Sequence, residues 1–348
     1  MLRQIARLSR PVPSAGERAF ALAVYGGIED EHVPAEQAGI EGVACVDDAA
    51  RALELFCDLW STTGLAWTLD RCHGLLDFIL AMQDADGRFV NFILDWEGAP
   101  NRSGRTSIAG GAFWQARGVL ALARASRALS DPRIDPALRR GWRHVVDATE
   151  VPPDVRVLHM RAALAQLGGD GDADLRRRLE GWAGELVACR RDGMLMNSPY
   201  ERGRPHLWGH LQEGVLAEWG ALAGRDDVVE VARHSAELVF AGAVDGGFDL
   251  PRTQPYDVAS AIDVLDTLAR VTGEDRYEGL ARAARAWFDG RNAAGAPIYD
   301  RDAGRVADGI DSGRVSSRSG AEANVVAAQA LFPDTVTLAR SAASGVPA

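Results

Sequence analysis

Lysine is absent from this 348-residue chain, so all 38 of its basic residues are arginine. Without a side-chain amine the protein cannot form a Schiff base with pyridoxal phosphate, use a lysine nucleophile or build the phosphate-binding lysine of a P-loop. We interpret the absence as the mark of a GC-rich genome rather than as a functional choice.

Cysteine is scarce, and the four present are Cys45, Cys57, Cys72 and Cys189. They form no CxxC pair and no zinc-like spacing, so we interpret them as reduced core residues rather than as a disulfide framework or metal site. We predict that the protein binds no metal ion and no cofactor.

Long hydrophobic runs are also missing, because no apolar stretch reaches the roughly 18 residues of a membrane-spanning helix. The first residues lack the continuous apolar core of a signal peptide, so we expect a cytoplasmic protein with no membrane partner. The formal net charge is −11 and the sequence pI is about 5.2. Such an acidic protein repels phosphate backbones, which disfavours a nucleic-acid partner.

A repeat is present in the loops. Asp-Gly or a similar turn followed by an apolar residue occurs at Asp86-Gly87, Asp192-Gly193, Asp245-Gly246 and Ala294-Gly295. The spacing fits a unit of about 50 residues, so the chain holds six to seven units.

Helical patterns of two kinds alternate between these loops. Six stretches rich in Ala and Leu carry few charges and should be buried on all sides: 51–59, 111–129, 157–167, 210–222, 257–268 and 322–331. Six more amphipathic segments lie near 17–25, 65–79, 136–148, 175–189, 227–241 and 277–288.

Twelve helices that alternate between outer and inner positions predict an all-α protein with an (α/α)6 toroid fold, formed by residues 1–348 as a single domain. The alternative is an open solenoid of helical pairs, because sequence does not show whether the ring closes. We favour the ring, since six units close the common helical toroids.

Polar residues gather where the buried helices begin, which in a toroid is one mouth of the ring. Asp47 and Asp48 open the first of these helices and are followed by Arg51. Two carboxylates beside a guanidinium predict an acid–base pair; the alternative is a helix cap with a salt bridge. Glu322 opens the sixth buried helix, and we expect it to face Asp47 or Asp48 across the ring.

The loop before the second buried helix carries Trp96, Arg105 and Trp114. Flat aromatic rings suit the C–H face of a sugar, so Trp96 and Trp114 are candidate stacking residues. We expect Arg51, Arg105 and His206 to bind hydroxyl or acidic groups of the substrate; Trp114 is equally a candidate core residue.

Histidines provide a second group of candidates. His159 lies in the middle of the third buried helix, where a histidine is more often a satisfied core residue than a catalyst. His206, Trp208, His210 and Glu213 cluster at the fourth helix start. The spacing of His206 and His210 resembles a metal site, but no HExxH glutamate lies between them. We therefore expect His206, His210 and Glu213 to bind sugar hydroxyls, and Trp208 to stack on a sugar face.

Asp257 completes the set of candidate carboxylates. It follows Gln254-Pro255-Tyr256 at the fifth helix start, where it is either a catalytic group or an N-terminal cap.

Taken together, these features resemble the six-hairpin glycosidase superfamily, in which carboxylates at the mouth of an α/α toroid cleave glycosidic bonds. Four short motifs are similar to helical domains that accompany bacterial family-4-type glycosyltransferases: 46–53, 254–257, 308–310 and 319–322. The chain departs from that pattern at Ala49, where Asn is usual, and after Glu322, where Ala323-Asn324 replaces Ser-Thr.

The leading functional interpretation is a carbohydrate-active enzyme, most simply a glycoside hydrolase that uses two of Asp47, Asp48 and Glu322 on a small-molecule or oligosaccharide substrate. A sugar epimerase or isomerase that uses His159, His206 and His210 is the first alternative. A terpene-cyclase-like toroid is another, because 78–89 resembles the glutamine–aromatic repeat of those enzymes. A non-catalytic sugar-binding or scaffold domain is the last.

Overall fold

The computed structural model describes residues 1–27, 41–168 and 172–344, and the chain groups into two compact units. The first unit comprises Met1–Thr149, Asp300–Asp308 and Ser317–Ala348, and the second comprises Glu150–Tyr299 and Gly309–Ser316. The second unit is thus inserted into the first, and the short segment Gly309–Ser316 belongs to the second unit although residues of the first lie on both sides of it in sequence. The expectation that residues 1–348 form one domain stays a prediction.

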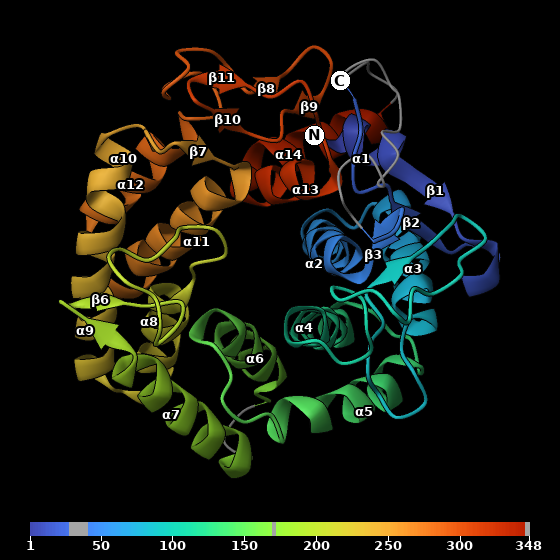
Figure 1. Ribbon diagram of the computed structural model, residues 1–348, viewed down its shortest axis with the longest axis horizontal. Coiled ribbons are helices and arrows are strands. Elements are labelled where there is room, and N and C mark those ends of the chain that lie inside the picture. The colour runs from blue at the N-terminus through green and yellow to red at the C-terminus, as the bar shows by residue number, and fades with distance from the viewer. Residues whose placement is uncertain (28–40, 169–171, 345–348) are drawn as a thin grey trace. The chain divides into compact units, whose positions relative to one another are not determined.

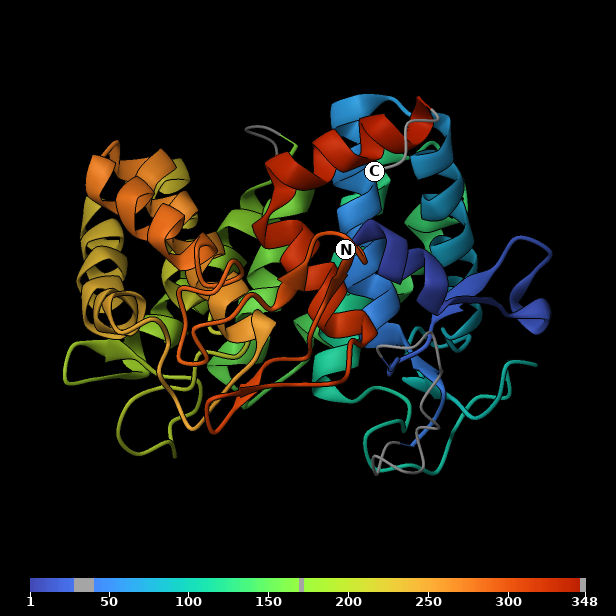
Figure 2. The same cartoon turned by 90° about the horizontal axis from the view of Figure 1, so that it is seen from above.

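Three helical hairpins build the first unit (Figure 1). Its helices are α1 (Leu2–Leu8), α2 (Val46–Thr63), α3 (Ala66–Ala81), α4 (Ala112–Ala128), α5 (Ile134–Val146), α13 (Ala321–Ala330) and α14 (Phe332–Ala343). Helix α2 is central, since it packs against α3, α4, α13 and α14. Figure 2 shows α13 and α14 in red beside the blue α2.

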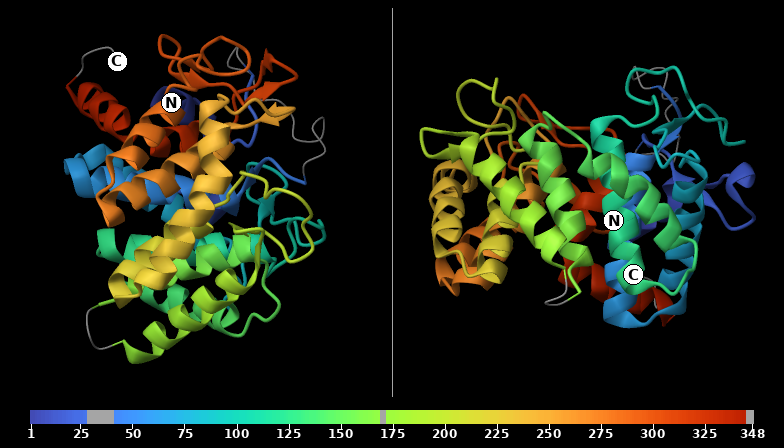
Figure 3. Two further views of the ribbon diagram at one scale, coloured as in Figure 1. Left: turned by 90° about the vertical axis from the view of Figure 1, so that its left-hand side faces the viewer. Right: turned by 90° about the horizontal axis from the view of Figure 1, so that it is seen from below.

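The second unit has the same plan of three hairpins. Its helices are α6 (Pro153–Gln166), α7 (Ala173–Ala188), α8 (Gln212–Ala223), α9 (Asp226–Ala236), the π-helical turn η3 (Glu237–Ala241), α10 (Gly242–Asp245), α11 (Pro255–Thr272) and α12 (Asp275–Arg285). Helix α8 packs against α6, α9 and α11, and the two hairpins α8–α9 and α11–α12 lie side by side (Figure 3).

Short strands and one 3-10 turn, η1 (Pro13–Ala15), lie in the connections. The strands are β1 (Ser9–Pro11), β2 (Phe20–Leu22), β3 (Ala44–Cys45), β4 (Phe92–Ile93), β5 (Arg190–Arg191), β6 (Met194–Leu195), β7 (Arg252–Thr253), β8 (Tyr299–Asp300), β9 (Arg305–Val306), β10 (Ile310–Asp311) and β11 (Arg314–Val315). Antiparallel pairs join β1 to β2, β3 to β4 and β5 to β6, and β10 lies between β7 and β11. The β3–β4 pair fixes the point at which α2 begins.

The first helix of each hairpin is the more buried one, as the scarcity of charges predicted. In α13, eight residues are buried, whereas its partner α14 has two. Glycine ends several of these helices: Gly64, Gly224 and Gly273 follow α2, α8 and α11 with φ of 64°, 65° and 71°. This left-handed conformation costs little without a Cβ atom.

The repeated Asp-Gly loops also have a structural reason. Positive φ occurs at Gly87 (95°), Gly193 (84°) and Gly295 (60°), each soon after the second helix of a hairpin. In the Asp245-Gly246 loop Gly246 has φ of −79°, and the positive φ of 63° falls one residue later, at Gly247. At Gly87 a Cβ atom would lie 2.4 Å from the carbonyl group of Arg140, so the turn needs glycine for space as well. The repeat read from the sequence is therefore confirmed as a recurring turn.

The segment 17–25 was predicted to be an amphipathic helix, and this is wrong. Its residues 20–22 form β2, which pairs with β1. Gly16, with φ of 133°, ends the 3-10 turn directly before this segment, and the pairing of β2 with β1 then fixes an extended backbone. The missing amphipathic helix is α14, so each buried helix is followed by its partner and not preceded by it.

Candidate functional site

Side chains from the first two turns of three buried helices meet in the first unit. Asp47, Asp48 and Arg51 come from α2, Arg117 from α4 and Glu322 from α13. We call these five residues the carboxylate–arginine cluster. Because helix N-termini carry partial positive charge, this end of the unit suits carboxylates.

Arg51 joins two carboxyl groups. Its Nη1 lies 3.0 Å from Asp48 Oδ1 and its Nη2 lies 2.9 Å from Glu322 Oε2. The side chains of Asp48 and Arg51 are each 5% exposed, whereas that of Glu322 is 30% exposed. Glu322 was predicted to face Asp47 or Asp48 across the ring. Instead, α13 packs directly against α2, and Glu322 and Asp48 share one guanidinium.

Burial changes the protonation of Asp48. It raises the pKa of this carboxyl to about 6, and the negative charges of Glu322 and Asp47 act in the same direction, while Arg51 opposes them. Asp48 Oδ2 also accepts a hydrogen bond from Cys45 Sγ at 3.4 Å, and burial raises the pKa of that thiol. Asp48 is thus a carboxyl group that still holds a proton in mildly acidic solution.

Asp47 has separate partners. Its Oδ1 lies 3.2 Å from Arg117 Nε, and its Oδ2 accepts a hydrogen bond from Asn91 Nδ2 at 3.2 Å. The Asn91 amide oxygen in turn accepts from the Asp47 backbone N–H. These contacts hold the more exposed of the two neighbouring aspartates in one orientation.

Tyr25 is a further member of this region that sequence analysis missed. Burial raises the pKa of its phenol, and the charges of Asp308, Asp48 and Glu322 add to the effect. The guanidinium carbon of Arg318 lies 5.4 Å from the Tyr25 ring centroid. Tyr25 ends the segment 17–25, which was expected to be an amphipathic helix, and the candidate residues were taken from the starts of the buried helices.

The aromatic loop residues lie on α4 and the connection before it. Trp114 donates its indole N–H to the carbonyl of Ile108 at 3.0 Å and is half-buried, as is Trp96. A Cβ atom on Gly111 would lie 1.8 Å from the Trp114 ring, so glycine there permits this ring position. Arg105 is exposed.

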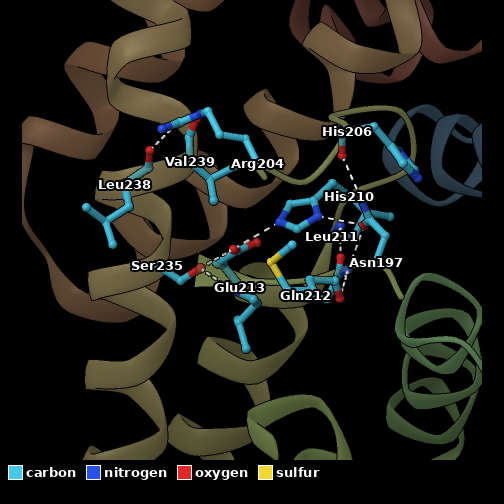
Figure 4. A network of polar contacts seen from close by, with 12 residues as sticks. Asn197, Arg204, His206, His210, Leu211, Gln212, Glu213, Ser235, Leu238 and Val239 are labelled. Carbon is cyan, nitrogen blue, oxygen red and sulfur yellow. Dashed lines mark hydrogen bonds and ion pairs between the residues drawn. The ribbon is translucent and has the colours of Figure 1, made fainter. Parts of the chain in front are cut away.

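The second unit contains a closed polar network centred on His210 (Figure 4). His210 Nδ1 lies 2.7 Å from Asn197 Oδ1, and His210 Nε2 lies 3.0 Å from Glu213 Oε1. Asn197 Oδ1 also accepts from Gln212 Nε2, so His210 Nδ1 carries a proton. Ser235 Oγ donates to Glu213 Oε1 at 2.6 Å.

This network is inaccessible, because the side chains of His210 and Glu213 are 0% exposed. Glu213 Oε2 is buried and has no hydrogen-bond partner. The predicted contacts of His210 and Glu213 with substrate hydroxyls stay a prediction, and they require that the network open.

A loop presents His206 at the surface of the same unit. Glu201 Oε1 accepts from the His206 backbone N–H at 3.1 Å, and Asn197 Nδ2 donates to the His206 carbonyl at 2.9 Å. Arg204 donates to the carbonyls of Leu238 and Val239 in the π-helical turn (Figure 4). The loop is therefore anchored on both sides of an exposed imidazole.

Two neighbours of this loop come from other helix starts. The ring of Trp208 packs edge to face against that of Tyr256, at the beginning of α11, with 5.1 Å between the ring centroids. Asp154, in the first turn of α6, has a pKa raised by burial, and the charge of His206 opposes that rise. Asp154 was not among the residues predicted from sequence.

His159 and Asp257 have structural contacts. His159 is 3% exposed and its Nδ1 lies 3.2 Å from Arg156 Nη1. Burial lowers the pKa of His159 to about 3, and the charge of Arg156 adds to this. Asp257 Oδ2 accepts from the Gln254 backbone N–H at 2.6 Å and closes a capping box on α11, which is the alternative that the sequence left open.

Among the described residues, no group of three or more His, Cys, Asp or Glu side chains is placed to hold a metal ion. Within the same residues, no helix has both the length and the apolar character needed to cross a membrane.

Sequence comparisons identify no relative: no family model matches the chain, and no curated protein matches it. The resemblance to helical domains that accompany glycosyltransferases therefore finds no support.

Solved structures do match over nearly the whole chain. Cellobiose 2-epimerase from Bacillus thermoamylovorans B4167 has a TM-score of 0.71 at 10% identity, covering 96% of each chain. A D-mannose isomerase has a TM-score of 0.69 at 8% identity, covering 97% of each chain. A GH76 α-mannanase from Bacteroides thetaiotaomicron has a TM-score of 0.57 at 11% identity, covering 86% of this chain and 88% of that chain. The chain thus has the all-α (α/α)6 toroid fold of these structures, as its sequence predicted.

Proposed function

We propose that this protein is a carbohydrate-active enzyme, and specifically a glycoside hydrolase that works through the carboxylate–arginine cluster. In this proposal Asp48 is the proton donor to the leaving glycosidic oxygen. Glu322 is the carboxylate that either takes a proton from the attacking water or attacks the anomeric carbon itself.

One observation carries the proposal: Asp48 and Glu322 lie on the same guanidinium, and burial sets the pKa of Asp48 at about 6. Glycosidases need two carboxyl groups near the scissile bond, one protonated and one ionised, about 5 to 9.5 Å apart. Different environments give neighbouring carboxyl groups these different roles.

Exposure separates Asp47 and Glu322 from His159 and His210, whereas Asp48 is buried and His206 is exposed. Glu322 and Asp47 are partly exposed, at 30% and 21% of their side chains. By contrast, both ring nitrogens of His210 are bonded inside the closed network, and the low pKa of His159 makes it a poor proton acceptor.

A sugar epimerase or isomerase is the second candidate. It is favoured by the higher structural similarity to the cellobiose 2-epimerase and the D-mannose isomerase than to the α-mannanase. In that case His206, the exposed imidazole of the second unit, is the proton-transfer group to test first.

The test is a product assay on the purified protein with neutral oligosaccharides, aryl glycosides and free aldoses. For a hydrolase we expect glycosidic cleavage, and we expect Asp48→Asn and Glu322→Gln each to lower kcat at least about 100-fold while ligand affinity stays within a few fold. Asp58→Asn is the matched control, since Asp58 is also on α2 but forms a surface ion pair with Arg124.

Other outcomes point elsewhere. Formation of an epimer or ketose that survives both carboxyl substitutions and is lost in His206→Asn would replace the hydrolase by the second candidate. Sugar binding with no product in any assay would indicate a binding domain.

A further inference from the structure

The arginines of the carboxylate–arginine cluster already face carboxylates of this chain. Arg51 contacts both Asp48 and Glu322, and Arg117 contacts Asp47. Both arginine side chains are 5% exposed. A guanidinium that is buried against its own counter-ion has little charge left to offer to an anionic ligand.

The arginines of the neighbouring loop follow the same pattern. Arg102 forms two hydrogen bonds to the carboxylate of Asp84, at 2.9 and 2.7 Å. The pKa of the Glu41 carboxyl is lowered, first by a hydrogen bond from the Thr106 hydroxyl and also by the positive charge of Arg105. Arg105, which the sequence offered as a ligand for substrate, thus also faces an acidic side chain.

The charges of the cluster balance. With Asp48 protonated, the two guanidinium groups are matched by the carboxylates of Asp47 and Glu322; once Asp48 ionises, the cluster is negative. The whole protein carries a net charge of −11, so the long-range field also repels anions.

We propose that the site takes neutral sugars, recognised through their hydroxyl groups, and excludes uronic acids and sugar phosphates. A hydroxyl can donate to a paired carboxylate and accept from a paired guanidinium at the same time, so it needs no unmatched charge. A carboxylate or phosphate placed here would meet two or three carboxylates without a spare cation to offset them. This inference rests on the proposed function, because it specifies the substrate of the same site.

The test uses three matched pairs of sugars that differ only at C6: D-glucose and D-glucuronate, D-mannose and D-mannuronate, and D-galactose and D-galacturonate. Binding is measured by the ligand-dependent rise in Tm, with sodium chloride added to equalise the ionic strength. For the wild-type protein we expect at least one neutral sugar to bind about tenfold or more tightly than its uronate.

Two variants test the physical cause. Asp47→Asn and Glu322→Gln each remove one negative charge from the cluster, so each should shift the ratio of the two dissociation constants toward the uronate, by about tenfold. The second variant guards against misfolding of the first, because Glu322 is the more exposed carboxylate. Asp58→Asn, with its surface ion pair, should leave the ratio unchanged.

The outcomes separate this inference from the proposed function. A uronate that binds the wild-type protein as tightly as its neutral partner, or more tightly, overturns the charge argument and leaves a carbohydrate site in place. A ratio unmoved in both variants overturns the assignment to this cluster. Failure of all six sugars to raise Tm, together with no turnover of any glycoside, contradicts the proposed function and this inference with it.

Discussion

Asp48 is buried beside two other carboxylates, and this sets its contribution to stability. Burial raises the pKa of its carboxyl from 3.8 to about 6, so between those values the folded protein holds a proton that the unfolded chain has released. Where the folded state binds more protons, the free energy of unfolding falls as pH rises. The stabilising contribution is therefore complete below about pH 4 and is lost as pH rises through about 6.

His159 acts in the opposite direction. Burial lowers its pKa from 6.5 to about 3, so in that interval the unfolded chain binds the extra proton. The free energy of unfolding contributed by His159 consequently rises with pH up to about 6.5. The two residues oppose each other in mildly acidic solution.

We predict that Asp48→Asn removes the falling component, worth about 3 kcal/mol between about pH 4 and pH 7. His159→Asn should remove the rising component, so the remaining decline of the free energy of unfolding with pH becomes steeper. Asn is chosen because its Oδ1 can accept from Arg156 in place of His159 Nδ1. Urea unfolding at several pH values measures both slopes. Identical slopes in the wild-type protein and Asp48→Asn would mean that folding does not raise the pKa of Asp48.

At the scale of elements, the polar network of α8 stabilises the α8–α9 hairpin. Glu213 on α8 joins His210, in the preceding loop, to Ser235 on α9, and all three side chains are buried. Removal of Glu213 takes this hydrogen-bond partner from the buried ring nitrogen of His210 and from the buried hydroxyl of Ser235.

We therefore predict that Glu213→Ala lowers the free energy of unfolding by about 2 to 6 kcal/mol, since each of the two buried groups left unsatisfied costs about 1 to 3 kcal/mol. Glu218→Ala is the control on the same helix, at a half-buried position, with an expected loss of about 1 kcal/mol or less. Urea unfolding compares the two. Equal losses would show that the network contributes no more than ordinary packing.

The elements themselves were largely predictable. Stretches poor in charge became α2, α4, α6, α8, α11 and α13, and the recurring Asp-Gly turns appeared where the repeat indicated. The error at 17–25 has a local cause: a few apolar residues fit a helix as well as a strand, and only the pairing of β2 with β1 distinguishes them.

At the scale of the whole molecule, charge governs which partners can approach. A protein with a net charge of −11 repels the phosphates of DNA and RNA. We predict no binding to double-stranded DNA in an electrophoretic mobility assay at about 0.15 M salt. Binding that weakens steeply with added salt would show a basic surface patch that the net charge conceals.

The sequence by itself determined the buried helices and the acidic character of the protein, because each follows from local periodicity or composition. It also indicated which helix starts carry polar groups. Only the tertiary structure decided that Asp48 is buried while Asp47 is partly exposed, and that Arg51 contacts a carboxylate 271 positions later at Glu322. It likewise decided that His210 is enclosed. Burial and pairing depend on residues distant in the chain, and no local pattern records them.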